Sequence, residues 1–536
     1  MLFFKAGEGL LADNRCRDCS ASGIAILDTG EQVVVASNTC AGNMQGIYVR
    51  NSPVILDGND VSNNKLYGFL IVGPGKPTLR RNIIQDNGAY GICCDGVVPN
   101  IEPNNIFSGN KSGAVFPRGI LQLAEPPQSP ARPPVASSEP PSSKPTQEEQ
   151  PGKPRVIRTW QVGKDAATLE EAVQKAQAGD IVLLPEGKFV LARELVIDKA
   201  LTLRGAGRDK THVISTAANY VLNLQGPGPY TVEGINFSHS GLSGADILVV
   251  TGCEECQIIG CRFANARRDV NQKQYGRGLV INAVSCQIRN TLVEDNESTG
   301  VSLRGPPQAK FLCEEITVSG NGGIGLAIEG GHAIVKKASA LKNRADGFMV
   351  GLGNQIRAQF ESCLALENNW TGIGLWGGEV IVSKCECKNN RLQGVCARNN
   401  SKLTAIGNTC TGNGQSGIRF QENATGSATK NQCFNNTFGI SLLDETTALI
   451  EGNLCSNNKS HGILSQDRSK PTVRFNQCLG NFRSGIAVEG NASPELEGNT
   501  CQRNQEYGIN LSPSANPKVG PKNILFPNGL GPTNRR

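Results

Sequence analysis

The 536-residue chain has few histidines and methionines, four and three respectively. This scarcity argues against a copper site, which uses those ligands. No apolar run reaches the ~18 residues of a membrane-spanning helix. The net charge of +6 is small for this length and is not gathered in one segment, which argues against nucleic acid as a partner.

Helical periodicity is missing from the most regular part of the chain, residues 394–512. A Gly-Ile or Gly-Val pair recurs there every 22 or 23 residues, at Gly394, Gly417, Gly439, Gly462, Gly485 and Gly508. An Asn-x-Cys motif lies between these glycines, starting at Asn408, Asn431, Asn453, Asn476 and Asn499. A second asparagine column lies four residues before each glycine, at Asn390, Asn413, Asn435, Asn458, Asn481 and Asn504. A fixed short period indicates stacked units that cannot bury their apolar faces alone.

Each repeat has the pattern of short strands rather than of helices. Apolar residues alternate within short runs, as in Gly485–Glu489, and turns rich in Asn and Gly separate the runs. Such a unit is one coil of a parallel β-helix, whose coils stack about 4.8 Å apart and align identical residues in ladders. A leucine-rich repeat has a similar period but requires a Leu-x-x-Leu-x-Leu pattern, which these repeats do not have. We predict an all-β solenoid of 22–25-residue coils.

The repeats occur in two parts of the chain. Glycines at the same spacing, from Gly23 to Gly113, predict a short β-helix over residues 1–124. Its first coil has no recognisable cap, so we expect this β-helix to be truncated at its N-terminus. Residues 125–154 hold ten of the 28 prolines and are predicted to form a solvated Pro/Ser-rich linker. A long β-helix is predicted over residues 155–536, with a C-terminal tail.

The long β-helix is predicted to open with a capping helix near 169–178. Thr168-Leu-Glu-Glu171 is a capping box, and apolar residues follow on one helical face. Next come Gly179-Asp-Ile-Val-Leu-Leu-Pro-Glu-Gly187 and Leu201-Thr-Leu-Arg-Gly-Ala-Gly207. These motifs resemble the N-terminal cap and first coils of the pectate-lyase-like right-handed parallel β-helix superfamily. The later coils are similar to its sugar-binding and sugar-hydrolysing modules and to the solenoids of F-box ubiquitin-ligase receptors. The resemblance implies right-handed coils but says little about chemistry, because this fold hosts unrelated activities.

The nineteen cysteines are interpreted as packing residues. In earlier coils the column of Cys410–Cys501 is expected to hold Phe237, Phe263 and Leu292, which indicates an inward apolar position where Cys acts as a small hydrophobic residue. We therefore predict a buried thiol ladder, no metal and no cofactor.

The remaining cysteines argue against a metal site and against an oxidising compartment. A zinc site at Cys253, Cys256 and Cys261 has no evident fourth ligand. Unpaired thiols and the absence of a signal-peptide core favour a reducing compartment. Members of the resembled family are typically secreted. The resemblance therefore implies secretion if the N-terminus of this chain is truncated.

Two surface segments are candidates for ligand binding. The first is the polar loop 265–277, with Arg267, Arg268, Asp269, Lys273, Tyr275 and Arg277. The second is the position four residues after the repeat glycine, which should face outward and carries Arg304, Trp376 and Arg398. An indole beside arginines can stack on a sugar and hold an acidic group.

We predict a recognition scaffold that binds an extended ligand, first of all a glycan, along an outward-facing groove. The catalytic signatures of the resembled family, such as Asp-Pro-His, Asp-Asp or Gly-His-Gly, do not occur, so no catalytic residue is assigned and binding is favoured over catalysis. One alternative is a polysaccharide lyase, epimerase or hydrolase whose catalytic residues have left these motifs. Another is a receptor for a protein substrate, similar to the β-helix of F-box proteins.

Overall fold

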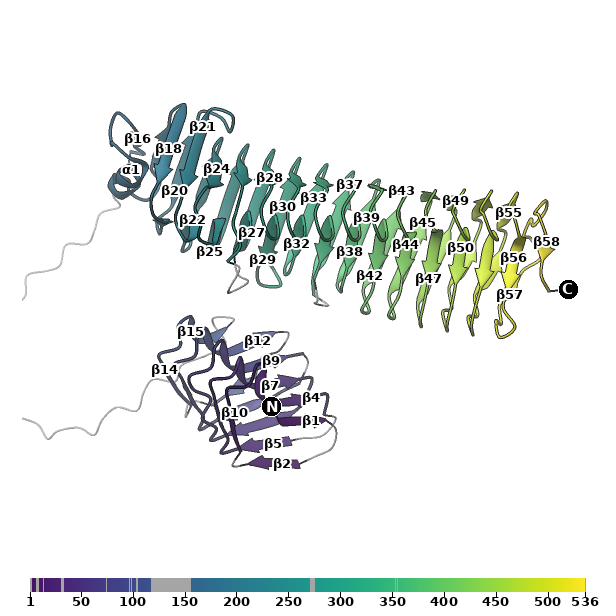
Figure 1. Ribbon diagram of the computed structural model, residues 1–536, viewed down its shortest axis with the longest axis horizontal. Coiled ribbons are helices and arrows are strands. Elements are labelled where there is room, and N and C mark those ends of the chain that lie inside the picture. The colour runs from purple at the N-terminus through teal and green to yellow at the C-terminus, as the bar shows by residue number, and fades with distance from the viewer. Residues whose placement is uncertain are drawn as a thin grey trace, which may run out of the picture. The chain divides into compact units, whose positions relative to one another are not determined.

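The computed structural model describes residues 2–116 and 156–535, apart from 6–8, 13, 30–32, 74, 96, 98, 103–104, 270–274, 352 and 354. The chain divides into two compact units, Met1–Glu148 and Glu149–Arg536. Each unit is a parallel β-helix (Figure 1). The predicted linker lies outside the described residues. In the described part of the chain, no helix is both long and apolar enough to cross a membrane.

Three sheets wind along the long unit. The first sheet consists of β19 (Leu195–Ile197), β22 (Asn219–Gln225), β25 (Ala245–Ile259), β27 (Leu279–Arg289), β29 (Val301–Arg304), β32 (Leu326–Ile328), β35 (Phe348–Val350), β38 (Ile373–Leu375), β41 (Val395–Ala397), β44 (Ser416–Phe420), β47 (Phe438–Leu442), β50 (Ile463–Ser465), β53 (Ile486–Val488), β56 (Tyr507–Leu511) and β58 (Gly531–Thr533). From β27 to β56 each of these strands begins within one residue of a repeat glycine. The second sheet runs from β16 (Thr159–Gln161) to β57 (Lys518–Val519), and the third from β18 (Gly187–Leu191) to β55 (Thr500–Gln502). The long strands β25 and β27 pass from the first sheet into the second.

The short unit repeats this plan. Its first sheet contains β1 (Leu2–Lys5), β4 (Ser22–Leu27), β7 (Gln45–Arg50), β9 (Tyr67–Val72), β12 (Tyr90–Asp95) and β15 (Gly113–Phe116). A second sheet runs from β2 (Gly9–Ala12) to β13 (Asn100–Ile101), and two strand pairs, β3 (Arg15–Arg17) with β6 (Thr39–Ala41) and β11 (Ile83–Gln85) with β14 (Ile106–Ser108), form the third side.

One helix, α1 (Leu169–Lys175), lies at the N-terminal end of the long unit (Figure 1). The Thr168 side chain accepts a hydrogen bond from the Glu171 N–H at 3.2 Å, as the capping box predicts. Leu169, Ala172 and Val173 are buried in the core of the unit. The helix ends three residues earlier than predicted, because Ala176 is already extended, with ψ of 146°.

The repeat glycines allow neighbouring coils to approach closely. A Cβ placed on Gly417 would lie 2.8 Å from the Gly439 carbonyl oxygen and 3.0 Å from the Asn436 side-chain nitrogen. Only glycine fits this corner without shifting the backbone of the next coil.

Two buried asparagine ladders connect the coils, as the repeats predict. The Asn453 backbone N–H and Nδ2 both donate to Asn476 Oδ1 at 2.9 Å, and Nδ2 also donates to the Ala428 carbonyl at 2.8 Å. Asn453 Oδ1 in turn accepts from the Asn431 N–H, so each side chain satisfies a main-chain N–H and C=O of the preceding coil and contacts the ladder asparagine of the next. In the second ladder, the partner of Asn413 is Asn436, and the predicted Asn435 is wrong by one residue. Asn435 instead occupies the turn position before the ladder asparagine, with φ of 59°, as Asn389 and Gly412 do in the preceding coils.

The predicted cysteine ladder is also present. Six buried cysteines face one another in register across adjacent strands of the third sheet: Cys387, Cys410, Cys433, Cys455, Cys478 and Cys501. Phe237 and Phe263 occupy this column in earlier coils, stacked at 5.6 Å between ring centroids. The column then continues to Val293, so the prediction of Leu292 is wrong by one position.

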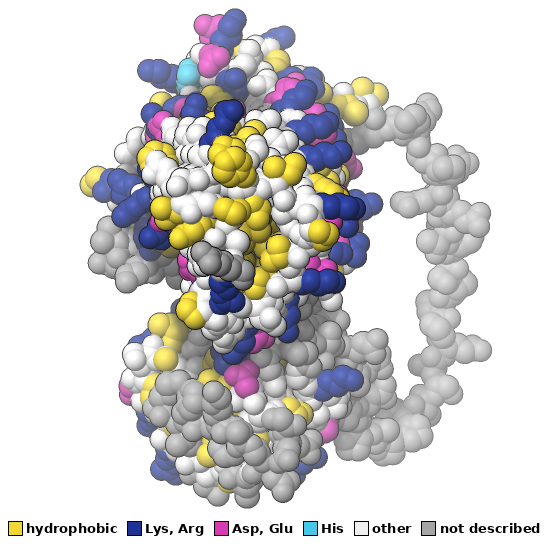
Figure 2. Space-filling model, turned by 90° about the vertical axis from the view of Figure 1, so that its right-hand side faces the viewer, with side chains coloured by type: hydrophobic (Ala, Val, Ile, Leu, Met, Phe, Trp, Pro, Cys, Tyr) yellow, Lys and Arg dark blue, Asp and Glu magenta, His cyan; other side chains and the backbone are white. Residues whose placement is uncertain are grey.

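Charged residues on the second sheet are largely paired. Glu379, for example, lies 2.8 Å from Lys402 Nζ and 3.9 Å from Arg357 Nε, both on neighbouring coils. Figure 2 shows basic and acidic side chains interspersed on the flanks of the long unit, and hydrophobic side chains on the end that faces the viewer. Exposed apolar residues of the last coil include Val519, Ile524, Phe526 and Leu530.

Replacing Asn453 with alanine should lower the free energy of unfolding by about 3 kcal/mol, because the buried Asn431 N–H and Ala428 C=O of the preceding coil lose their partner and the ladder is interrupted. Asn369→Ala, at an exposed turn, is the control and should change it by less than about 0.5 kcal/mol. Urea unfolding of the three proteins measures this difference. Equal midpoints for all three would contradict the role given to the ladder.

Candidate functional site

The outward side of the first sheet has a floor of mostly small side chains. In each short strand the first and third residues belong to the core, as Val395 and Ala397 do in β41, so the middle residue points outward. We call these middle residues, two positions after each repeat glycine, the floor column. In register, it runs through Ala327, Met349, Gly374, Cys396, Arg419 and Ser441.

Polar residues one or two positions before the repeat glycines line one side of this floor, and we call them the wall column. Thr371 Oγ1 donates to Gln393 Oε1 at 3.0 Å, and Gln393 Nε2 donates to Gln415 Oε1 at 2.6 Å. Arg419 Nη1 donates to the same Gln415 oxygen at 2.9 Å. The result is one hydrogen-bonded row that joins successive coils of the long unit.

Asp346 begins this row and lies directly over Gly374. Its Oδ2 would be 2.9 Å from a Cβ at position 374, so glycine makes room for the carboxyl group. The Thr371 N–H donates to Asp346 Oδ1 at 2.8 Å. The side chain is only 4% exposed, and burial raises the pKa of Asp346, although the Thr371 N–H, the charge of Arg398 and the Trp376 side chain oppose that shift.

Trp376 and Arg398 lie on the opposite side of the floor, four residues after their repeat glycines, in what we call the rim column. The Arg398 guanidinium carbon is 4.3 Å from the centroid of the Trp376 ring, a cation–π contact. Arg398 Nη2 also donates to Cys396 Sγ at 3.3 Å. Its Nε is buried and has no hydrogen-bond partner among the described residues.

Arg419 is the basic residue of the floor column. Nε donates to Ser441 Oγ at 3.1 Å and Nη2 to Ser416 Oγ at 3.2 Å. Burial lowers the pKa of Arg419, and the nearby charge of Arg398 lowers it further, while Cys396 opposes the shift. The guanidinium is thus largely desolvated, and its hydrogen-bond acceptors are neutral.

This arrangement can perform two kinds of recognition. The Trp376 ring can stack on the apolar face of a ring-shaped ligand. The guanidinium groups of Arg398 and Arg419 can bind an anionic group, and the amides and hydroxyls of the wall column can bind hydroxyl groups.

The structure brings together only some of the predicted site residues. Trp376 and Arg398 are in contact. Within the loop 265–277, Arg268 forms an antiparallel bridge with Tyr275, and Arg267 forms one with Ala245. Lys273 lies outside the described residues. The loop precedes Gly278, four coils before Trp376, which corresponds to about 19 Å along the solenoid.

The other predicted residues have structural partners. Arg277 Nη2 is 2.6 Å from the carboxylate of Asp246, which is 1% exposed. Arg304 pairs with Glu329 of the next coil, and that carboxylate also accepts a hydrogen bond from Ser302 Oγ. Asp269 packs against Gly244. These contacts account for Arg277, Arg304 and Asp269 without a ligand.

Sequence reasoning missed Asp346, Gln393, Cys396 and Arg419. The signal available in the sequence was a polar residue immediately before a repeat glycine, or two positions after it, where an apolar or small residue is expected. Within the repeats, our sequence interpretation considered only the position four residues after the glycine.

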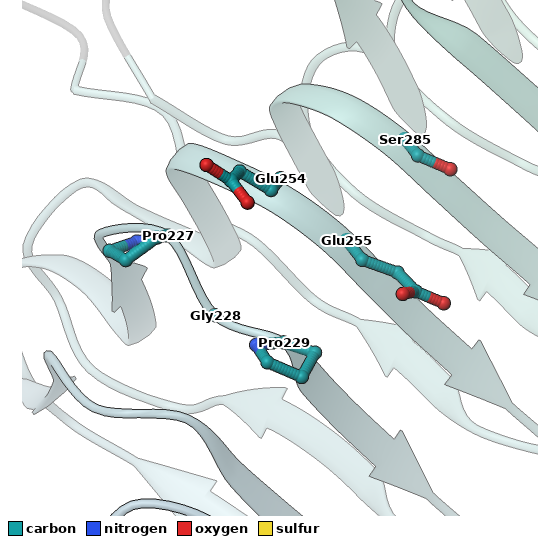
Figure 3. A pocket seen from close by; sticks show the side chains of 6 residues that line it. All are labelled: Pro227, Gly228, Pro229, Glu254, Glu255 and Ser285. Atoms are coloured by element: carbon teal, nitrogen blue, oxygen red, sulfur yellow. The ribbon is translucent and has the colours of Figure 1, made fainter.

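Two hollows occur elsewhere on the long unit. One, of about 270 Å³, is lined by Pro227, Gly228, Pro229, Glu254, Glu255 and Ser285. Figure 3 shows the carboxylates of Glu254 and Glu255 pointing in different directions, so they do not converge on one reacting atom. The other, of about 390 Å³, is lined by Asp444, Asp467, Arg468, Gly490 and Asn491.

Comparison with known proteins supports the fold. The family described as "Right handed beta helix region" matches residues 2–120, 243–391 and 371–524, which confirms the predicted right-handed β-helix. No match to a curated protein was found.

Several solved structures are similar. The Azotobacter vinelandii mannuronan C-5 epimerase AlgE4 A-module is 13% identical, with 64% of this chain and 90% of that chain covered and a TM-score of 0.38. The periplasmic alginate epimerase AlgG is 11% identical, with 68% and 82% covered and a TM-score of 0.39. The catalytic domain of a GH87 alpha-1,3-glucanase is 9% identical, with 69% and 70% covered and a TM-score of 0.38. At these values the likeness says nothing about activity.

Replacing Asp346 with asparagine should make stability less dependent on pH. The pKa of Asp346 is raised in the folded protein, so the stability it contributes is present at acidic pH and is lost as the pH rises through the folded pKa. The thermal midpoint of Asp346→Asn should therefore exceed that of the wild type at pH 7 and match it well below pH 4. Asp209→Asn, at an exposed position, is the control. A lower midpoint for Asp346→Asn at pH 7 would show that the ionised carboxylate is the favoured form.

Proposed function

The chain belongs to the right-handed β-helix family, and we propose that its long unit is a recognition scaffold that binds an acidic glycan on the outward side of the first sheet. The observation that carries this proposal is the contact of Trp376 with Arg398 beside the floor formed by Gly374 and Cys396. The glycan would run along the solenoid axis, across the strands β35 to β47.

The neutral groups of the site suit a sugar ring. An indole offers a flat apolar surface for the C–H face of a pyranose, and its fixed position limits the entropy lost on binding. Gln393 and Gln415 are already held by hydrogen bonds to one another, so the wall column is preorganised. Amides and hydroxyls of this kind pair with sugar hydroxyls.

The two guanidinium groups favour an acidic sugar over a neutral one. Arg419 is desolvated and donates to neutral acceptors, and Arg398 has a buried Nε without a partner among the described residues. A carboxylate or sulfate on the glycan would supply the missing counter-charge and accept charge-assisted hydrogen bonds. The arginines of the second sheet, by contrast, already have acidic partners, as Arg357 has in Glu379.

Asp346 supports catalysis as a second candidate function. A buried carboxyl group with a raised pKa is suited to proton transfer, as in a lyase or epimerase. Glycoside hydrolysis, however, usually requires two carboxyl groups about 5–10 Å apart, and the network around Trp376 and Arg398 contains one. Binding without turnover is therefore the first choice.

The test uses the full chain in affinity electrophoresis through gels that contain alginate, polygalacturonate or a neutral glucan. Trp376→Ala and Arg398→Gln should each weaken retention by an acidic polysaccharide about tenfold, the effect of losing one anchor worth 1.4 kcal/mol. Trp370→Ala is the matched control, because Trp370 is 49% exposed on the preceding turn. Unchanged retention of both site variants would refute the proposal.

The same incubations should be analysed for new reducing ends and for unsaturated products. Binding without products is the expected result. If the wild type forms products and Asp346→Asn does not, the protein is a catalyst that uses Asp346 rather than a binding scaffold.

A further inference from the structure

The short unit carries a group of tyrosines at positions equivalent to those of the long-unit site. Tyr67 and Tyr90 lie in the wall column, immediately before Gly68 and Gly91, and Tyr48 lies in the floor column, two residues after Gly46. The strands β7, β9 and β12 that carry them are adjacent and in register, with Gln45 opposite Tyr67 and Tyr48 opposite Leu70. Three of the seven tyrosines of the chain thus lie on one small surface.

The burial pattern places these side chains on the outward side of the sheet. Ile47, Val49, Phe69, Ile71 and Ile92 belong to the core of the short unit. The alternate residues therefore point away from the core. The tyrosines are all half-buried, so each ring retains solvent-accessible surface.

The rings lie against the sheet surface rather than projecting from it. A ring carbon of Tyr90 is 3.7 Å from the position of a Cβ at Gly113, so this ring covers the glycine of the next coil. The Tyr67 side chain lies close enough to Cys93 on β12 to lower the pKa of that thiol, although burial raises it overall. These contacts restrict the rotation of the rings, as in a preorganised stacking surface.

The charge of this surface differs from that of the long-unit site. Arg50, the basic residue of its rim column, is paired with Asp28, with Nε 3.3 Å from Oδ1. The next residue of the same column with a charge is Asp95. Among the described residues of this surface, no unpaired guanidinium calls for an anion, in contrast to Arg398 and Arg419.

We propose that Tyr48, Tyr67 and Tyr90 form a second glycan-binding surface, on the short unit, that selects neutral sugar residues. The rings stack on the sugar faces, and their hydroxyl groups, with Gln45, bind sugar hydroxyls. The ligand class rests on the proposed function of the long unit, while the location rests on the tyrosines themselves. The protein would then bind a neutral glycan through one unit and an acidic glycan through the other.

The competing explanation is that the tyrosines only stabilise the sheet, since aromatic residues are favoured on pleated surfaces. Leucine keeps the apolar packing but has no flat ring face, and phenylalanine keeps the ring but has no hydroxyl. Tyr67→Leu/Tyr90→Leu and Tyr67→Phe/Tyr90→Phe therefore separate the two explanations. Tyr507→Leu is the matched control, because Tyr507 occupies the wall column of the long unit.

The experiment measures retention of the full-length proteins in gels that contain neutral polysaccharides: cellulose ether, starch, xylan and laminarin. The polysaccharide that retains the wild type is then used for the variants. The double variant Tyr67→Leu/Tyr90→Leu should be retained by it at least tenfold more weakly. The phenylalanine pair should keep most of the retention, and Tyr507→Leu should bind the polysaccharide as the wild type does. Thermal unfolding monitored by circular dichroism checks that the variants are folded.

Three results would overturn the inference: no retention of the wild type by any of these neutral polysaccharides, wild-type retention of a folded leucine pair, or equal loss in the Tyr507 control. If the leucine double variant does not fold, nitration of Tyr67 and Tyr90 is measured in the wild type instead. The polysaccharide that retains the wild type should then slow the nitration of both tyrosines. Nitration that is unchanged by this polysaccharide would contradict the inference. The proposed function fails separately, when Trp376→Ala and Arg398→Gln leave binding to acidic polysaccharides unchanged.

Discussion

The structure depends on hydrogen bonds that join each coil to the next, above all on the two buried asparagine ladders. At each turn the chain leaves main-chain groups without partners in their own coil, and a buried amide such as that of Asn453 satisfies an N–H and a C=O of the preceding coil while it bonds the asparagine of the next. The ladders also fix the register of successive coils. Because the register is fixed, a residue at a given position in one repeat always lies beside the residue at that position in the next.

This alignment turns a sequence position into a surface column, and it is the reason that a site can form across coils. Asp346, Thr371, Gln393 and Arg419 are 22 to 26 residues apart in the chain, yet they belong to one connected polar row. The small floor residues Gly374 and Cys396 lie beside it, and Trp376 and Arg398 border them. The short unit uses the same columns with tyrosines in place of the amide and guanidinium groups. One scaffold therefore supports two chemically different surfaces.

The sequence predicts the fold well because the fold is periodic. Repeated glycines, asparagines and cysteines report directly on corners, turns and core positions, and errors such as Asn435 for Asn436 arise where a 22-residue repeat shifts the turn by one residue. The site is harder to predict because it breaks the period. Trp376 and Arg398 were recognisable as outward residues at a fixed distance from a glycine. Asp346 and Arg419 were not, since each carries a charge where its neighbours in the same column, such as Thr371 and Ser441, are uncharged. Arg277 was assigned to a binding loop, but it pairs with the buried Asp246, a partner 31 residues away that no motif links to it.

Hydrogen–deuterium exchange of the full chain, with and without alginate or polygalacturonate oligomers, tests most directly whether the outward side of the first sheet is the acidic-glycan site. Slower exchange is expected in peptides that contain β38, β41 and the turns with Trp376 and Arg398, with little change around the loop 265–277. Protection confined to that loop, or no protection with either acidic oligomer, would contradict the account.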